Sequence, residues 1–362
     1  MQLSQVGVLP SQKIKELITE RKIEARTEIE KEQIQPSSLD LRLGAQAWRI
    51  QASFLPGNQT SVLEQLQTLA MHSMDISSGC IFEKNCVYLV LLEEHLNLPS
   101  ELNAISNAKS SIGRLDLLTR LITDFGTEFD RIINGYKGPL YAEINPKSFS
   151  VLVHSGMKLN QIRFRSGKVI VKDEQLKRLN IEQNLTGKDS IIEDGISFSV
   201  DLKGNNNNIV GYQAKAHAPL IDLRKINYYE ISEFWDPVFA KFERLILDPG
   251  AFYILVSKET VHIPPQYAAE MSPYLAFVGE FRVHYAGFFD PGFGHTAVGG
   301  DGSRGVLEVR CHESPFTLQD GQTVGRLVYE HMAEIPDILY GSALNSNYQG
   351  QKLRLSKHFK IN

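Results

Sequence analysis

Two serines and an arginine in the first half of the chain have the types and spacing of a phosphate-binding loop. Ser110, Ser111 and Arg114 lie close together in the sequence. An arginine can bind phosphate oxygens with two parallel N–H groups, and serine hydroxyls supply further donors. In the second half, Glu308 follows Gly305-Val306-Leu307 in a strand-like stretch, where a carboxylate can move protons at a base. Together these residues indicate chemistry on a nucleotide.

Many residues of the second half resemble residues of the first half. The two members of each pair are separated along the chain by nearly the same number of residues as Glu143 and Glu308. Further matching pairs are Gly156 and Gly321, Val87–Val90 and Phe252–Leu255, Leu98-Pro99 and Ile263-Pro264, and Ile162–Phe164 and Leu327–Tyr329. One displaced match, Ser38–Arg42 with Ser199–Lys203, extends the duplication to the first strand of each copy. The period is too long for a solenoid repeat and predicts two tandem domains of ordinary size.

The composition is typical of a folded, two-domain protein. The chain has 362 residues, of which 42% are hydrophobic and 22% charged, and its net charge is −4. Without a basic excess we expect no nucleic-acid polymer and no membrane surface as partner, although a small anionic ligand needs only a few local cations. The residues from Met1 to Gln5 lack the pattern of a signal peptide, so we expect a cytoplasmic location. Cys80, Cys86 and Cys311 form no Cys-x-x-Cys pair and are expected to be reduced thiols.

Strand signals dominate after a short helix that we expect to begin at Ser11, a residue type that caps helices. The strand-like segments are Cys80–Leu92, Leu140–Ile144, Phe149–Val153, Ile162–Phe164, Ala251–Ser257, Val306–Arg310 and Gly325–Tyr329. Ser155-Gly156 and Asp320-Gly321 are expected to be tight turns with positive φ. The predicted fold class is mainly β, with two barrel or jelly-roll domains and a few short helices. We expect a first domain over residues 1–170, a connection over 171–190 and a second domain over 191–362.

Four motifs in the sequence resemble those of deoxycytidine triphosphate (dCTP) deaminases and occur in the order of that family. They are Pro36–Gly44, Ser110–Leu115, Ala286–Phe293 and Tyr348–Gln351. The resemblance covers nearly the whole chain, as two fused copies like the longer bacterial deaminases. It implies two domains of the dUTPase-like β fold and hydrolytic deamination of dCTP to dUTP and ammonia, which supplies dUTP for thymidylate synthesis. It further implies Mg²⁺ bound with the nucleotide triphosphate and a homo-oligomer, either a trimer or a smaller assembly of two-domain chains.

The base that activates water is expected to be a glutamate, with no zinc. Zinc-dependent nucleobase deaminases need His-x-Glu followed by Pro-Cys-x-x-Cys, and this sequence has neither. Glu308 and Glu143 both match the family's catalytic position, each in its own repeat, and partial burial would raise the pKa of a carboxylate toward that of a useful base. We prefer Glu308, because it follows Asp290–Phe293, whose aspartate contacts the sugar in the family. In the first repeat we match that turn to Asp124–Gly126, without its proline. For either glutamate, the alternative is an edge-strand carboxylate that faces water.

The phosphate arm is expected in the first repeat alone. The resemblance makes Ser110, Ser111 and Arg114 ligands of the triphosphate, whereas the equivalent stretch Leu275–Gly279 has neither serine nor arginine. Taken alone, Ser-Ser-x-x-Arg is also common in structural loops and helix caps. In the family's trimers the arm and the catalytic hairpin come from different subunits, so each repeat of a duplicated chain is free to lose one half. Of the two geometries, a site built from one chain or from two, we favour one chain.

The C-terminal residues match the lid of the family. Tyr340, Asn347 and Gln351 lie at the spacing of its tyrosine, lysine and glutamine, so Asn347 removes one expected cation. Lys352 or Arg354 is a candidate to replace that charge. We also expect Val306, two residues before Glu308, to contact the nucleotide.

Two other functions remain open from the sequence. The first is a dUTPase, or a bifunctional enzyme that deaminates dCTP and then releases pyrophosphate, although the tail lacks the clustered glycines of dUTPases. The second is a nucleotide-binding protein without catalytic activity. Incubation with dCTP separates these possibilities by the products.

Overall fold

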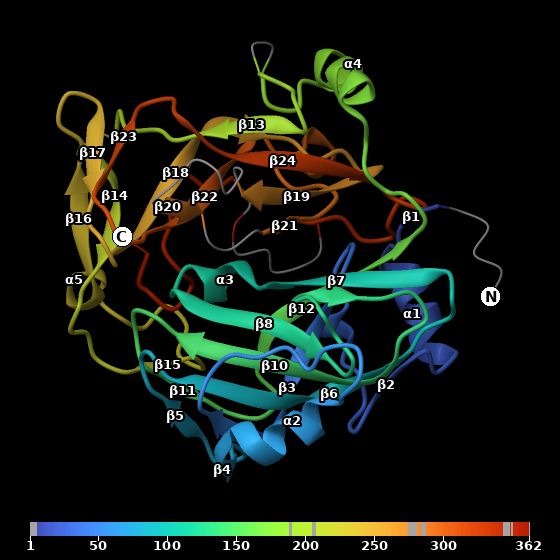
Figure 1. Cartoon of the computed structure of the whole chain (residues 1–362). Helices are drawn as coiled ribbons and strands as arrows, with labels where there is room; N and C mark the ends of the chain where they lie inside the picture. The colour runs from blue at the N-terminus through green and yellow to red at the C-terminus, as the bar shows by residue number, and fades with distance from the viewer. Residues whose placement is uncertain are drawn as a thin grey trace. The chain divides into compact units, whose positions relative to one another are not determined.

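The computed structural model describes residues 6–187, 190–204, 208–273, 281–283, 287–342, 348 and 350–361. Contacts divide the chain into two units. The first comprises Met1–Val169, Pro219–Lys225 and Met332–Asp337, and the second Ile170–Ala218, Ile226–His331 and Ile338–Asn362. Each unit consists mainly of antiparallel strands, drawn as arrows in Figure 1, which confirms the mainly β fold class.

The first unit begins with strand β1, helix α1 and strand β2 and then continues almost entirely in strands. Its elements are β1 Gly7–Val8, α1 Ser11–Thr19, β2 Ile23–Ala25, η1 Lys31–Gln33, β3 Leu39–Ile50, α2 Val62–Leu69, β4 Ala70–Asp75, β5 Cys80–Phe82, β6 Val87–Asn97, β7 Leu102–Ala108, α3 Ser110–Gly113, β8 Leu117–Thr123, β9 Arg131–Ile132, β10 Lys137–Pro146, β11 Val151–Val153, β12 Lys158–Ser166 and β15 Ile221–Asp222. The main sheet has the order β8-β10-β6-β3-β12-β7-β9. β-branched and apolar residues favour these strands, and the central β3 and β10 have runs of consecutive buried residues, so both faces of these two strands are covered.

The second unit repeats the central strand pairings of the first. Its elements are α4 Asp173–Gln183, β13 Ile196–Ser199, β14 Ile209–Ala214, α5 Ile231–Phe234, β16 Trp235–Phe239, β17 Arg244–Leu247, β18 Phe252–Val261, β19 Tyr267–Pro273, β20 Phe281–Val283, β21 Phe288–Phe289, η3 Thr296–Val298, β22 Ser303–Cys311, β23 Phe316–Gln319 and β24 Thr323–His331. The strands form sheets of order β13-β24-β19-β21 and β16-β14-β18-β22-β20, with β17 paired to β23. The long β3 of the first unit joins both halves of its sheet, whereas β13 and β14 divide that role in the second unit.

Strand register confirms the constant offset at the centre of each unit. Glu143 of β10 lies opposite Leu89 of β6, and Glu308 of β22 lies opposite Ile254 of β18. The two glutamates are separated along the chain by as many positions as their two partners, so they occupy equivalent places in equivalent hairpins. The expected positive φ is also present at both turns, 78° at Gly156 and 77° at Gly321.

Register corrects the displaced match of the first strands. In the first unit, Arg42 of β3 lies opposite Lys158, and in the second unit Ser199 of β13 lies opposite Thr323. Because Thr323 follows Lys158 by the same offset that separates the two glutamates, Ser199 corresponds to Arg42 and not to Ser38. The similar letters of Ser38–Arg42 and Ser199–Lys203 are therefore out of register.

Two local expectations also change. The segment from Cys80 to Leu92 is two strands, because a turn at Glu83–Cys86 separates β5 from β6 and Asn85 adopts a φ of 63° there. The segment 171–190, expected to be a connection, contains α4, whose Leu176 and Leu179 belong to the apolar core of the second unit. The helix expected at Ser11 is present, with Pro10 rather than Ser11 at the N-cap.

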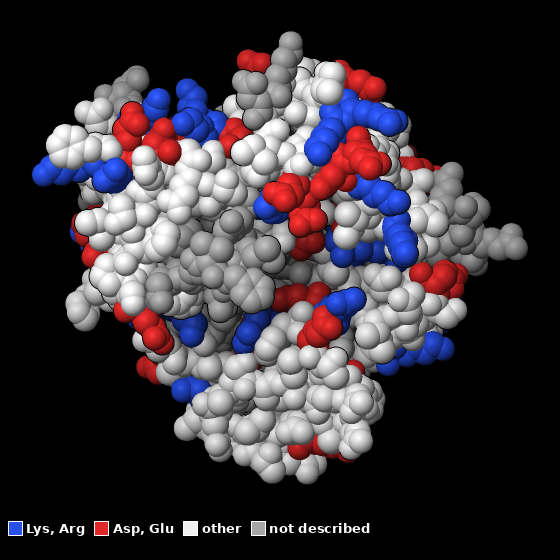
Figure 2. Space-filling view, turned by 45° about the horizontal axis from the view of Figure 1, so that its top comes forward, with Lys and Arg blue, Asp and Glu red and all other residues white. Residues whose placement is uncertain are grey.

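On the face drawn in Figure 2, Lys and Arg lie beside Asp and Glu in several places, and wide areas without charged residues separate them. Cys80, Cys86 and Cys311 are free thiols. Among the helices that the structure describes, none has the length and apolar character needed to cross a membrane.

Candidate functional site

The second unit brings Glu308 and the turn that begins at Asp290 into one assembly. Glu308 is 4% exposed on β22, and Val306 lies on the same face of the strand two residues earlier. Asp290 is 8% exposed and follows β21 directly. The backbone N–H of Gly302, just before β22, donates to the carbonyl of Gly294 at 2.9 Å. The turn is therefore tied to the strand that carries the glutamate.

The C-terminal segment of the second unit contacts both parts of this assembly. The backbone N–H of Tyr340 donates to the carbonyl of Pro291 at 2.8 Å. The Gln351 side chain donates through Nε2 to the carbonyl of Arg304 at 2.9 Å, and the Arg304 N–H donates to the carbonyl of Gln351 at 3.0 Å. Two of the three expected lid residues therefore lie against the turn and the strand; the third, Asn347, is outside the described residues.

The two candidates to replace the missing lysine differ in exposure. Lys352 is exposed, whereas the Arg354 guanidinium is partly buried and lies 5.6 Å from the centre of the Tyr348 ring. The end of the chain beyond them is held by Phe359, which is 2% exposed and packs against Phe234 and Trp235. This anchor fixes one end of the segment that carries Gln351.

The turn of the first unit that corresponds to Asp290–Phe293 is Ile133–Tyr136, which corrects the match to Asp124–Gly126. In the first unit the turn follows the short strand β9, which pairs with β7. In the second unit the turn follows the short strand β21, which pairs with β19. The Leu98 N–H donates to the carbonyl of Tyr136 at 2.9 Å, and its counterpart in the second repeat, Ile263, donates in the same way to Phe293 at 2.9 Å. Ile133 therefore stands where the second unit has its aspartate.

Asp124 has a structural contact instead. Its Oδ1 accepts a hydrogen bond from the backbone N–H of Val62 at 2.8 Å, at the first residue of α2. Burial raises the pKa of the Asp124 carboxyl, and the hydrogen bond from Val62 opposes that rise. The side chain thus satisfies a helix N–H that has no partner within the helix.

Ser110 and Ser111 of the expected phosphate arm lie in the short helix α3 of the first unit, between β7 and β8, and Arg114 is the C-cap of this helix. Ser110 is partly exposed, whereas Ser111 and Arg114 are 5% and 2% exposed. The Arg114 N–H donates to the carbonyl of Ser110 at 3.2 Å, so one turn of helix connects the serine to the arginine. Burial of a charged guanidinium is costly unless charges or polar groups surround it.

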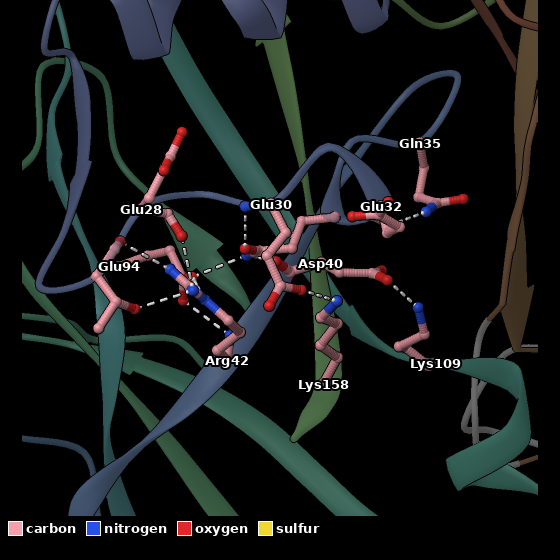
Figure 3. A network of polar contacts seen from close by, with 11 residues as sticks. Glu28, Glu30, Glu32, Gln35, Asp40, Arg42, Glu94, Lys109 and Lys158 are labelled. Carbon is pink, nitrogen blue, oxygen red and sulfur yellow. Dashed lines mark hydrogen bonds and ion pairs between the residues drawn. The ribbon is translucent and has the colours of Figure 1, made fainter. Parts of the chain in front are cut away.

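Lys109, which directly precedes the arm, is a residue that the sequence analysis missed. It is the N-cap of α3, and its ammonium pairs with Oδ2 of Asp40 on β3, as Figure 3 shows. Its backbone N–H donates to the carbonyl of Leu159 on β12 at 2.8 Å. Asp40 is only 2% exposed, so the residue at the start of the arm is attached to two neighbouring strands by its backbone and its charge.

The Pro36–Gly44 motif, which contains Asp40, also contains Arg42, and an ion pair of Arg42 with Glu94 joins β3 to β6. The Arg42 Nε donates to Oε1 of Glu94 at 2.9 Å, and the Arg42 backbone N–H donates to Oε2 at 2.8 Å (Figure 3). Gln33 donates to the same carboxylate at 2.9 Å. Burial raises the pKa of Glu94, while the hydrogen bonds from Arg42 and Gln33 lower it. Asp40 and Arg42 of the Pro36–Gly44 motif therefore make structural contacts that join β3 to its surroundings.

We expect Asp40→Asn to weaken binding of a nucleotide triphosphate and to leave the rate of the chemical step less changed, because it releases Lys109 at the start of the arm. The free energy of unfolding should fall by roughly 1–3 kcal/mol, since a charged partner is lost from a buried site. Thermal unfolding and KM against kcat measure the two effects. The matched control is Glu30→Gln, because the neighbouring pair of Glu30 with Lys158 is half exposed and worth about 0–1 kcal/mol. Equal losses in both variants would contradict an anchoring role for Asp40.

Glu143 in the first unit is a buried carboxylate that forms an ion pair with the partly exposed Arg120. Glu143 is 1% exposed, and its Oε1 accepts hydrogen bonds from Nε and Nη2 of Arg120 at 3.2 and 2.5 Å. Its other oxygen, Oε2, is buried and has no hydrogen-bond partner among the described residues. Arg120 was also missed by the sequence analysis, because the register that sets it opposite Glu143 is a property of the sheet.

Among the described residues, no three His, Cys, Asp or Glu side chains are grouped so that they could bind a metal ion. The expected absence of catalytic zinc stays a prediction.

Comparison with known proteins identifies both halves of the chain. Residues 5–168 match the family model "2'-deoxycytidine 5'-triphosphate deaminase (DCD) N-terminal domain", and residues 172–359 match the corresponding C-terminal domain. A crystal structure of 2'-deoxycytidine 5'-triphosphate deaminase from Agrobacterium tumefaciens is 49% identical, with a TM-score of 0.87, over 91% of this chain and 99% of that chain.

Curated relatives are more distant and are matched over part of their length. Proteins named "dCTP deaminase, dUMP-forming" are 31% identical over 115 residues in Beutenbergia cavernae and 31% identical over 133 residues in Corynebacterium efficiens. These matches cover 30% and 35% of this chain, and 55% and 63% of the two relatives. The two family domains, one after the other, account for nearly all of the sequence, and the chain therefore belongs to the dCTP deaminase family.

Proposed function

We propose that this protein deaminates dCTP hydrolytically, with Glu308 as the general base. The observation that carries the proposal is the assembly in the second unit, where a buried glutamate on β22 is joined to the Asp290 turn, Tyr340 and Gln351. Family membership supports the choice of substrate. Glu143, the other candidate, lies in the first unit, whose corresponding turn has Ile133 in place of Asp290.

In the proposed reaction Glu308 moves protons between water and the base. It accepts a proton as the water oxygen bonds to C4 of cytosine, and it passes this proton to N3. It then carries the second proton of the water to the departing amino group, the C4–N bond breaks, and ammonia leaves as the C4 carbonyl forms. The carboxylate is regenerated, so a single glutamate serves each step.

The remaining candidates supply binding. Asp290 is proposed to accept a hydrogen bond from the sugar, with Val306, Tyr340 and Gln351 beside the nucleoside. Ser110, Ser111 and Arg114 are proposed to bind the triphosphate, and the ion pair of Lys109 with Asp40 holds the start of this arm. The Ser110, Ser111 and Arg114 side chains can donate hydrogen bonds and carry no negative charge, which fits an Mg²⁺ ion held mainly by phosphate oxygens and water. We also propose that the chain acts in the cytoplasm and as a homo-oligomer.

The product is the part of the proposal with a specific rival. We propose dUTP and ammonia, whereas the names of the curated relatives favour dUMP for those proteins. Release of dUMP would need a second hydrolysis, between the α- and β-phosphates, with loss of pyrophosphate.

Incubation of the purified chain with dCTP and Mg²⁺, followed by chromatography of the nucleotides and assays for ammonia and pyrophosphate, tests the proposal. Ammonia with dUTP supports the deaminase, and ammonia with pyrophosphate and dUMP supports the bifunctional enzyme. Pyrophosphate without ammonia, or binding of dCTP without any product, would refute deamination.

A further inference from the structure

The first repeat keeps a buried carboxylate at the position that Glu308 occupies in the second. Glu143 and Glu308 share the same register in their hairpins and are 1% and 4% exposed. A buried carboxylate that stays charged needs a partner, because its transfer from water is otherwise costly. The shape and hydrogen-bond donors of that partner indicate which kind of group fits beside the carboxylate.

Arg120 fills this position with a planar cation. Its Nε and Nη2 approach Oε1 of Glu143 at 3.2 and 2.5 Å, and Nη2 also donates to the Ser53 hydroxyl at 2.7 Å. The guanidinium carbon lies 3.6 Å from the centre of the Phe129 ring. One edge of the guanidinium therefore faces a carboxylate while one face lies over an aromatic ring.

Cytosine would make the same two kinds of contact. Its 4-amino group donates to a carboxylate, its N3 does so when protonated, and its ring stacks on aromatic side chains. The N–C–N edge of a guanidinium has the same planar geometry as this amidine edge. Oε2 of Glu143, which has no partner among the described residues, is a remaining acceptor at the same carboxylate.

The turn of the first repeat gives an independent observation. Ile133, which corresponds to Asp290, is 64% exposed and offers no hydrogen-bonding side chain. The first repeat thus has an isoleucine in place of the aspartate proposed to bind the sugar, although it keeps the glutamate. Because the first repeat has a buried glutamate but lacks this contact with a nucleoside, we expect Glu143 to bind a group of the protein itself.

We propose that Arg120 is a built-in substitute for a cytosine base at Glu143, so that the first repeat contains a pyrimidine position filled by its own side chain. This inference rests on the proposed function, because it takes the second repeat as the active one. Glu143 then anchors Arg120. Removing the guanidinium opens the position to planar ligands with an N–C–N edge, such as guanidinium, acetamidinium or deoxycytidine.

The test uses the full chain with Arg120→Ala and measures thermal unfolding with low millimolar guanidinium chloride. We expect Tm to rise by about 2–4 °C more in this variant than in the wild type, whose Glu143 position is filled. Tetramethylammonium chloride, which has the same charge but no N–H group, should have no effect. Arg131→Ala is the matched control, because Arg131 is an exposed arginine of the same unit that pairs with Glu128. The rise should disappear in the double variant with Glu143→Gln.

Titration calorimetry with deoxycytidine gives the second readout. We expect Arg120→Ala to bind one more deoxycytidine per chain than the wild type. If Arg120→Ala does not fold, Arg120→Lys replaces it, since lysine keeps the charge but leaves the planar space open. A folded variant with no Glu143-dependent rise in Tm and no added deoxycytidine site would overturn the inference, even with dCTP deamination intact. Absence of deamination in the wild type together with these gains would refute the proposed function and leave the filled position standing.

Discussion

Replacement of Glu308 by glutamine should leave dCTP binding nearly unchanged and lower turnover by roughly two or more orders of magnitude, the usual scale for loss of a general base. Glutamine has the same shape and can still accept a hydrogen bond, but it cannot take a proton from water. Because glutamine is nearly isosteric with glutamate, we expect it to fit the buried position of Glu308 on β22. Single-turnover rates and equilibrium binding of dCTP separate the two effects.

The matched comparison is Glu143→Gln, at the same register in the first repeat. Thermal unfolding of both variants shows whether a loss of turnover comes from a loss of fold. Near-normal turnover in Glu308→Gln with a large loss in Glu143→Gln would move the catalytic position to the first repeat and refute our assignment.

Replacement of Arg114 by alanine should chiefly weaken nucleotide binding, by roughly 1.5–3 kcal/mol if one charge-assisted contact with phosphate is lost. The weakening should be large for dCTP and small for deoxycytidine, which has no phosphate. Because Arg114 is 2% exposed, thermal unfolding must accompany the binding measurement, with the exposed Arg131→Ala as control. An equal loss of affinity for dCTP and deoxycytidine would contradict a role in phosphate binding.

A mixture of Arg114→Ala and Glu308→Gln chains tests whether one site takes its arm and its glutamate from one chain or from two. If they come from different chains, some mixed assemblies contain an intact site and activity returns on mixing. If they come from one chain, every site keeps one lesion. We expect that deaminase activity does not return even when subunits exchange. This outcome follows if each of the two fused repeats has lost the half of the site that the other repeat keeps.

Residue types and their spacing were enough to determine the fold class and the central duplication. Paired strands of two homologous domains keep a constant register where no residue is inserted between them, so Glu143 and Glu308 could be matched by counting. The same reasoning found the positive φ at Gly156 and Gly321, because tight turns favour glycine for steric reasons. It also found the motifs that identify the family.

Where loop lengths differ, the sequence alone was misleading and the tertiary structure decided. Similar letters suggested Asp124 for the Asp290 turn and Ser199 for Ser38, but hydrogen bonds between strands give Ile133 and Arg42 as the equivalent residues. An insertion changes the count along the chain without changing which strands pair. Only the pairing therefore shows which positions are equivalent.

The partners of charged groups were likewise decided by tertiary structure. Lys109 lies 69 residues from Asp40, and Arg120 lies 23 residues from Glu143. No local pattern links such distant positions, because the sheet brings them together through register and side-chain direction. The sequence determined that acids and bases were present in the first repeat, and the fold determined which of them neutralise each other.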